Sequence, residues 1–237
     1  MTAKRLSLIL LLNVAGITLY LSWYLPAGHG AWFLVDKDIF FWFNNRLITN
    51  KPLLWYIAIT NYRAFDGVSL LAMGGLYYYY WRQQTSEGRR RMFSIGITML
   101  ITAVVLNQLG HLLPGHRPSP TEFFPQVNHV AELTGIPAKD ASANSFPGDH
   151  GLMLIIFTGY MLRYFGRSAF VISVIIVLFF SLPRVMIGAH WFSDIAVGSM
   201  SIALVFLSWV LLTPASDRLV RWVYRYLPAK LLSANNH

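Results

Sequence analysis

The strongest constraint on this chain is a series of long apolar runs, separated by short stretches that carry charge, Pro or Gly. A helix that crosses the hydrocarbon of a bilayer needs about 20 mainly apolar residues. The runs that approach this length are 6–25, 52–81, 92–113, 150–164, 169–190 and 192–212. The pattern predicts an all-α membrane protein, in which a single domain over residues 1–237 forms a bundle of six transmembrane helices.

The second run is too long for one straight crossing and contains Asn61, Arg63 and Asp66. Its first part is predicted to lie at the outer interface, and the crossing itself to cover residues 66–81. Ionisable side chains at membrane depth are costly unless they are paired or functional. Two hypotheses stay open: Asp66 only neutralises the arginine, or the three residues hold a lipid headgroup.

Composition excludes several classes of protein. Hydrophobic residues make up 55% of the chain and charged residues 12%, which is too apolar for a soluble domain. The net charge of +9 does not indicate nucleic-acid binding, because Lys and Arg punctuate apolar runs instead of covering a soluble face. It suits anionic lipid headgroups. With no cysteine, disulfides and thiolate metal sites are excluded.

Basic residues predict the orientation through the positive-inside rule. Those that fall on one side of the six runs are Lys4, Arg5, Arg82, Arg89, Arg90, Arg91, Arg163, Arg167, Arg218, Arg221, Arg225 and Lys230. That side is predicted to be cytoplasmic, with both termini inside and with segments 26–51, 114–149 and 188–191 outside. The first run resembles a signal peptide but is longer than a usual apolar core, so an uncleaved anchor is favoured.

The first outer segment mixes aromatic and charged residues over positions 32–47. Two interpretations fit equally well: an amphipathic helix that lies in the outer interface, or a loop that belongs to an aromatic belt.

Three polar groups lie at the outer ends of the runs, and the last of them contains His190 and Asp194. On a helix that starts near His190, an Asp four residues later shares its face. The Asp194 carboxylate would accept a hydrogen bond from one ring nitrogen, so that the other nitrogen presents a lone pair. This arrangement is typical of an oriented nucleophile.

The second group is the segment Ser-Phe-Pro-Gly-Asp-His-Gly at 145–151, a turn that opens an apolar run. Asp149 is the predicted N-cap, and free backbone N–H groups there, including that of Gly148, would bind a phosphate oxygen. His150 is the predicted general acid and base, because imidazole titrates near neutral pH.

The first group contains His116 and Arg117, just past the third run. Arg117 and Arg184 are two guanidiniums that can clamp phosphate oxygens and stabilise charge on a transferring phosphoryl group.

A divalent metal is the main chemical alternative, since His150, His190, Asp149 and Asp194 offer N and O ligands. The adjacent arginines argue against a further positive charge, so we expect neither a metal nor another cofactor. The other histidines have no comparable setting and are predicted to be surface or loop residues: His29, His111, His129 and His237.

Taken together, the three groups resemble the motifs of the type-2 phosphatidic acid phosphatase superfamily: Lys-x6-Arg-Pro, Pro-Ser-Gly-His and Ser-Arg-x5-His-x3-Asp. The resemblance covers residues 107–194. It implies that His190 becomes phosphohistidine, that Asp194 is its partner and that His150 protonates the leaving group. It also implies that Arg117 and Arg184 bind phosphate.

The chain departs from this pattern in three places. Gly110 stands where the family has Lys, Gly148-Asp149 replaces Ser-Gly, and Pro183 replaces Ser. The missing cation could come from one of three residues: His111, His116 or Lys139. The missing hydroxyl donor could be replaced by the N–H of Gly148.

The variant motifs, with Asn-Tyr-Arg-Ala-Phe-Asp-Gly at 61–67, are similar to those of the enterobacterial subgroup that forms lipid A 1-diphosphate. This resemblance implies a bacterial inner-membrane enzyme with a periplasmic active site. Undecaprenyl diphosphate would donate its terminal phosphoryl group and lipid A would accept it. A lipid diphosphate phosphatase would use the same histidines, because acceptor choice depends on pocket shape and water exclusion. A non-catalytic lipid-binding protein is the alternative from another class.

Overall fold

The computed structural model describes residues 2–228, which contain helices, one isolated bridge between Tyr62 and Ala138, and no strand. The all-α prediction is confirmed. The elements are α1 (Ala3–Tyr24), η1 (Ala27–His29), α2 (Gly30–Asn44), α3 (Lys51–Thr60), α4 (Phe65–Arg82), α5 (Ser86–His111), α6 (Pro120–Phe123), α7 (Val130–Thr134), α8 (Asp149–Phe165), α9 (Arg167–Met186), η2 (Asp194–Ser199), α10 (Met200–Ile202), η3 (Ala203–Leu207), α11 (Ser208–Leu212) and α12 (Ala215–Tyr226). The predictions for Lys230 and His237 fall outside the described residues.

Four helices are long and apolar enough to cross a membrane, as judged by length and composition: α1, α5, α9 and the continuous helix Asp194–Leu212. They match four of the six predicted runs. The run 52–81 divides into α3 and α4, as its length and polar residues indicated. α4 and α8 do not meet the criterion that the other four meet, so their crossings stay predictions.

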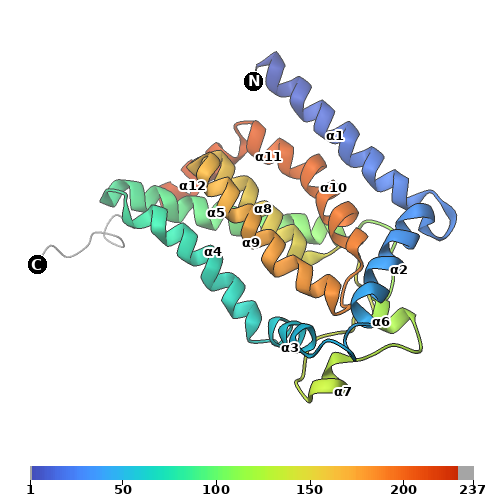
Figure 1. Cartoon of the computed structure of the whole chain (residues 1–237). Coiled ribbons are helices and arrows are strands. Elements are labelled where there is room, and N and C mark those ends of the chain that lie inside the picture. Colours follow the sequence, from blue (N-terminus) through green and yellow to red (C-terminus); the bar gives the residue numbers. More distant parts are fainter. Residues whose placement is uncertain (1, 229–237) are drawn as a thin grey trace, which may run out of the picture.

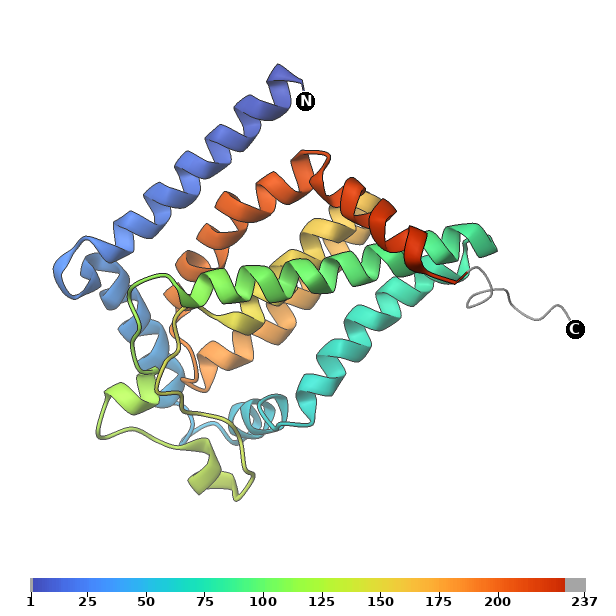
Figure 2. The ribbon, with the colours of Figure 1, turned by 180° about the vertical axis from the view of Figure 1, so that it is seen from behind.

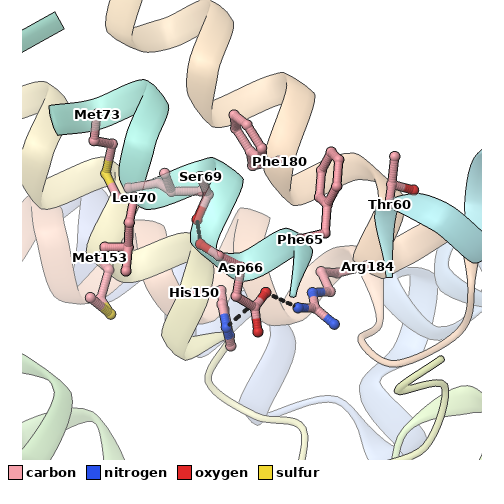
Figure 3. Close-up of a pocket in the computed structure, with 11 residues that line it drawn as sticks. Thr60, Phe65, Asp66, Ser69, Leu70, Met73, His150, Met153, Phe180 and Arg184 are labelled. Carbon is pink, nitrogen blue, oxygen red and sulfur yellow. Dashed lines mark hydrogen bonds and ion pairs between the residues drawn. The ribbon is translucent and has the colours of Figure 1, made fainter. Parts of the chain in front are cut away.

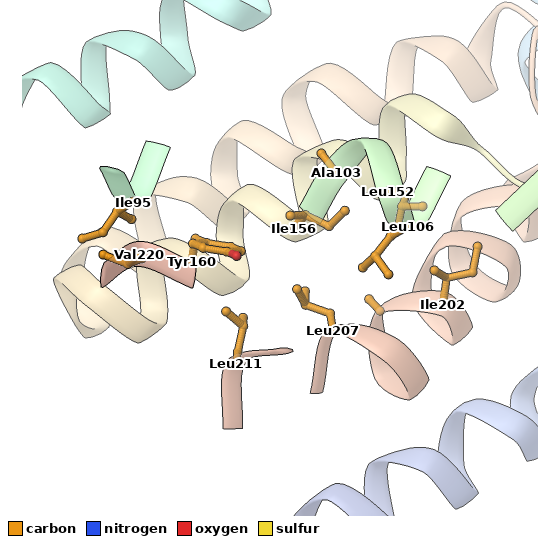
Figure 4. Packing of buried hydrophobic residues seen from close by; sticks show 11 residues of the cluster. Ile95, Ala103, Leu106, Leu152, Ile156, Tyr160, Ile202, Leu207, Leu211 and Val220 are labelled. Atoms are coloured by element: carbon orange, nitrogen blue, oxygen red, sulfur yellow. The ribbon is translucent and has the colours of Figure 1, made fainter. Parts of the chain in front are cut away.

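The core lies between α5, α8 and the last long helix (Figure 4). Lipid tails are as apolar as these side chains, so helices in a bilayer associate through close packing and interhelical hydrogen bonds. Gly159 of α8 allows close packing, since a Cβ there would lie 2.9 Å from Leu211 Cδ1. The buried hydroxyls of Thr102 in α5 and Tyr160 in α8 form an interhelical hydrogen bond, with their oxygens 2.7 Å apart.

α1 packs along the last long helix, where two π-helical segments, η2 and η3, interrupt the α-helical hydrogen bonds. Asn13 donates to the carbonyl oxygen of Val205 at 3.2 Å, and Gly16 lets the two backbones approach closely. At the other end of α1, Trp23 is fully buried and stacks on Phe146. This packing favours the anchor over the signal peptide.

The short helices α2, α3, α6 and α7 gather at one end of the bundle, and α12 lies at the other (Figures 1 and 2). Segment 32–47 is largely helix α2. Of the two interpretations given for this segment, the helix is therefore correct and the aromatic-belt loop is wrong. Its face of Asp36, Phe40 and Asn44 is buried in the protein, so the helix is not simply laid on an interface. Through Asp36, α2 contacts Arg117 and Ser193 beside the polar site.

Candidate active site

Residues from distant parts of the chain line a polar pocket of about 90 Å³ at the end where the short helices gather. His190, His150 and Arg184 all face it, whereas His116 and Arg117 of the first polar group do not line it. The remaining lining residues are His111, Lys139, Ser142, Asn144, Phe146, Pro147, Asp149 and Ala189.

His190 lies in a turn and not on a helix, because helical structure resumes only after Trp191. The reason given from the sequence for its pairing with Asp194 was therefore wrong, although the contact exists: Nδ1 lies 3.3 Å from Asp194 Oδ2. Gly188 makes this turn at φ +85, where a Cβ would also clash with Phe40.

The ring of His190 has a defined orientation. Its Nδ1 lies near two acceptors, the Asp194 carboxylate and the backbone oxygen of Ser145 at 3.0 Å. A nitrogen that faces two acceptors carries the proton, so Nε2 holds the lone pair. The side chain is 16% exposed and lines the pocket, which makes this nitrogen available to an electrophile.

Asp194 is fully buried, and both of its carboxylate oxygens have hydrogen-bond partners. Oδ2 accepts the backbone N–H of Trp191 at 2.9 Å, and Oδ1 accepts Arg117 Nη2 at 2.8 Å. Buried carboxylates persist only with such partners. Asp194 is thus a rigid anchor for the imidazole.

Arg117 was expected to clamp phosphate beside Arg184, but it does not line the pocket. Its Nη2 binds Asp194, Asp36 at 3.1 Å and Ser193 Oγ at 2.6 Å. The guanidinium also lies between the rings of Trp23 and Trp191, about 5 Å from each centroid. Phosphate binding by Arg117 stays a prediction, and these contacts favour a role in holding Asp194.

Asp36 is the residue that sequence reasoning missed. Its Oδ1 accepts the Ser193 backbone N–H at 2.8 Å and its Oδ2 accepts the Ser193 hydroxyl at 2.6 Å. Burial raises the pKa of this carboxyl, whereas Arg117 and Ser193 lower it, so the charged form depends on these partners. The available signal was the spacing of Asp36, Phe40 and Asn44, four residues apart, which puts the carboxylate on the buried face of α2.

Arg184 is the buried cation that faces the pocket, with 5% of the residue exposed. It pairs with Asp66 of α4. Its carbonyl oxygen accepts the backbone N–H groups of Ala189 and His190, at 3.1 and 3.2 Å. The phosphate-binding candidate and the nucleophile candidate are therefore tied together by the backbone.

The start of α8 differs from expectation in two ways. Gly148 is the N-cap, and Asp149 is the first helical residue. The N–H of Gly148 donates to the Asp194 carbonyl at 3.1 Å, so it is not free for a phosphate, contrary to the prediction. The next N–H groups, at Asp149, His150 and Gly151, have no acceptor within the helix and are the ones a phosphate can use.

Gly110, at the position of the family Lys, is closely packed. A Cβ there would lie 3.0 Å from Ile202 Cδ1 and 3.1 Å from Pro147 Cγ, so these side chains would have to give way by a few tenths of an ångström. His111 lines the pocket instead, with Nε2 3.5 Å from Asp149, and so does the exposed Lys139. His111 was predicted to be a surface or loop residue and was also named as a possible replacement for the family Lys; it is exposed, at the end of α5, and lines the pocket.

His116 is exposed, and its Nδ1 lies 2.9 Å from Asn144 Nδ2. It is not among the residues that line the pocket, whereas Asn144 is. His29 and His129 lie in a short turn and a loop, as expected.

The trio in segment 61–67 does not form one group. Asn61 is buried and donates to the Pro183 carbonyl at 3.0 Å, Arg63 is exposed, and only Asp66 reaches the site. Asp66 pairs with Arg184 and not, among the described contacts, with Arg63. The headgroup-binding role of the trio stays a prediction.

Within residues 2–228, no group of three or more His, Asp or Glu side chains is arranged to hold a metal ion. The two carboxylates nearest His190 and His150 have other partners, since Asp194 binds Arg117 and Asp66 binds Arg184. The expectation that no metal takes part in the chemistry stays a prediction.

The geometry describes a histidine with a free nitrogen, a second histidine, and a buried arginine around a small polar pocket. Residues 91–217 match the model of the PAP2 superfamily. The chain belongs to this superfamily. It is also 56% identical over 228 residues, covering 96% of each chain, to the lipid A 1-diphosphate synthase of Escherichia coli (strain K12). No solved structure matches.

Proposed function

We propose that this chain is a membrane phosphotransferase that moves the terminal phosphoryl group of undecaprenyl diphosphate to the 1-phosphate of lipid A. The products are lipid A 1-diphosphate and undecaprenyl phosphate. The chemistry rests on one observation: Nδ1 of His190 is held by Asp194 and Ser145, which leaves Nε2 free in the pocket. The acceptor rests on the 56% identity to a lipid A 1-diphosphate synthase over 96% of both chains.

In the first half-reaction, Nε2 of His190 attacks the terminal phosphorus of the donor. A nitrogen–phosphorus bond forms, and the bond from phosphorus to the bridging oxygen breaks. His150 gives a proton to the departing undecaprenyl phosphate. Arg184 and the first N–H groups of α8 stabilise the negative charge on the equatorial oxygens.

In the second half-reaction, an oxygen of the lipid A 1-phosphate attacks phosphohistidine. The nitrogen–phosphorus bond breaks, a new phosphoanhydride forms, and His190 regains its lone pair. An acceptor that arrives protonated returns its proton to His150. Asp194 keeps the ring in one tautomer through both steps and stabilises the charge that the ring acquires.

The proposed topology has six crossings, namely α1, α4, α5, α8, α9 and the helix Asp194–Leu212. The whole chain acts as one catalytic domain in the inner membrane, with both termini in the cytoplasm and the pocket at the periplasmic face. The positive-inside rule supports this orientation, because Arg82, Arg89 and Arg163 lie at the ends of helices remote from the pocket. Both lipid tails then remain in the bilayer.

The test uses purified protein in detergent with undecaprenyl diphosphate labelled in its terminal phosphate, with and without lipid A. We expect label on lipid A, followed by thin-layer chromatography, and none for His190→Ala. Acid-labile, base-stable label on the protein should accumulate without acceptor, and be absent from the His190→Ala variant.

Two outcomes would contradict the proposal. Label released only as inorganic phosphate would make the chain a lipid diphosphate phosphatase. Full transfer by a folded His190→Ala variant would remove His190 from the chemistry. The matched control is His129→Ala, which changes a histidine that pairs with Asp140 outside the pocket and should leave transfer intact.

A further inference from the structure

Asp66 is an acidic side chain that contacts both phosphate-handling groups of the site. Its Oδ1 accepts a hydrogen bond from Arg184 Nη2 and lies 3.8 Å from His150 Nε2 (Figure 3). The three residues come from α4, α9 and α8, respectively. One carboxylate oxygen thus joins three helices at the point where the chemistry is proposed to occur.

The location of Asp66 differs from that of a residue that binds phosphate. A second chamber of about 140 Å³ lies between α4, α8 and α9, and its lining is mostly apolar. His150 and Arg184 line both this chamber and the polar pocket, whereas Asp66 lines only the chamber. Asp66 therefore contacts His150 and Arg184 from the side of the second chamber. A phosphate in the polar pocket can bind both residues while the carboxylate stays in place.

Burial explains why Arg184 needs this partner. Its side chain is only 6% exposed, so a buried guanidinium with little solvation needs a protein partner. Asp66 is 46% exposed, and Ser69 Oγ donates to its backbone oxygen at 2.8 Å at the start of α4. The Asp66 carboxylate is the more hydrated partner, and its hydrogen bond with Arg184 Nη2 determines the direction in which the buried guanidinium points.

We propose that Asp66 is a positioning residue for the transfer reaction. It fixes the Arg184 guanidinium between the two chambers, and it gives His150 a carboxylate partner when the imidazole carries the proton for the leaving group. This inference rests on the proposed function. Because Asp66 is an anion beside an anionic substrate, it opposes ground-state binding, and its favourable effect is on the chemical step.

The test compares Asp66→Asn with Asp66→Glu in steady-state turnover with lipid A present, measured as formation of undecaprenyl phosphate. Asp66→Asn should lower kcat about 10- to 100-fold, as expected when a supporting hydrogen-bond partner is lost. KM for the donor should stay the same or fall, because one like charge is gone. Asp66→Glu keeps the charge and should recover part of kcat.

Asp38→Asn is the matched control, since it removes one exposed carboxylate from α2 and should change neither parameter. Thermal unfolding in detergent checks that all variants are folded. A rise in KM with unchanged kcat would overturn the inference and make Asp66 a headgroup ligand. Unchanged kcat and KM, or equal loss in Asp66→Glu and Asp66→Asn, would also overturn the positioning role.

This assay separates the inference from the proposed function. Undecaprenyl phosphate forms in both transfer and hydrolysis, so the effect of Asp66 is measured whichever acceptor receives the phosphoryl group. If wild-type protein releases inorganic phosphate only, the transferase proposal fails while the comparison of Asp66 variants still stands. If wild-type protein forms no undecaprenyl phosphate, both fail together.

Discussion

Two arginines of the same motif-rich region lie in contrasting surroundings. Arg117 is enclosed by Asp36, Asp194 and Ser193 and lies away from the pocket. Arg184 is equally buried, but its acidic partner is half exposed and its guanidinium borders the pocket. Arg117 holds Asp194, which orients the proposed nucleophile His190, and Arg184 borders the pocket in which we propose that the substrate binds. The contrast predicts which substitutions lower stability and which lower activity alone.

The largest effect is expected for Arg117→Ala. It leaves Asp36 and Asp194 buried without their shared cation, and removal of one partner from a buried ionic network costs about 3–5 kcal/mol. The variant should unfold at much lower denaturant or temperature in detergent, and should be inactive because His190 loses its anchor. Arg63→Ala, at an exposed position, is the control and should change the free energy of unfolding by no more than about 0.5 kcal/mol.

Arg117→Lys adds a finer comparison. Lysine keeps the charge but cannot reach Asp36, Asp194 and Ser193 together from one planar group, so it should recover only part of the stability. Full stability and activity in Arg117→Ala would show that the network does not hold Asp194.

Arg184→Ala should show the opposite pattern. The Asp66 carboxylate that it leaves behind can be hydrated, so the free energy of unfolding should fall by less than about 1 kcal/mol. Loss of a charged donor at the transferring group should lower kcat about 100- to 1,000-fold. Unfolding and turnover measured on the same preparation test both parts. A loss of stability as large as that of Arg117→Ala would remove the distinction between the two regions.

Ser193→Ala probes the network by a smaller step. The Ser193 hydroxyl accepts from Arg117 and donates to Asp36, both at 2.6 Å, and hydrogen bonds to charged groups contribute about 1.5–3 kcal/mol. We expect a stability loss of about that size, with turnover that remains measurable under stabilising conditions. Ser7→Ala, on the exposed side of α1, is the matched control. Unchanged stability would show that the carboxylate and guanidinium suffice without the bridge.

The sequence predicted the all-α class, because long apolar runs are a local pattern. Of the residues predicted for the site, His150, Arg184 and His190 line the pocket, whereas Arg117 and His116 do not. The sequence did not predict that Gly148 N–H is used by Asp194, since that hydrogen bond joins residues far apart in the chain. The role of Asp36 was missed for a similar reason, because its partners are distant in the sequence. Arg117 lies 81 positions from Asp36, and Ser193 lies 157 positions from it. The two interpretations of segment 32–47 gave Asp36 no role, whereas its face of α2 is buried.

The smallest predicted effect concerns the cation that replaces the family lysine. Gly110 is closely packed against Ile202 and Pro147 and carries no side chain, whereas Lys139 lines the polar pocket from the loop between α7 and α8. Lys139 is exposed, and an exposed charge pair contributes at most about 1 kcal/mol. Lys139→Ala should therefore raise KM for the donor by roughly two- to fivefold with little change in kcat.

Ionic strength distinguishes the effect of Lys139→Ala from that of Arg184→Ala. The effect of Lys139→Ala should shrink as ionic strength rises, because exposed charges are screened, whereas that of Arg184→Ala should persist. Lys51→Ala, at another exposed lysine at the same end of the bundle, controls for net charge and should leave KM unchanged. A loss of kcat in Lys139→Ala that is independent of salt would instead place Lys139 beside Arg184, in contact with the transferring phosphoryl group. The region that contacts the substrate would then include the loop between α7 and α8, which carries Lys139.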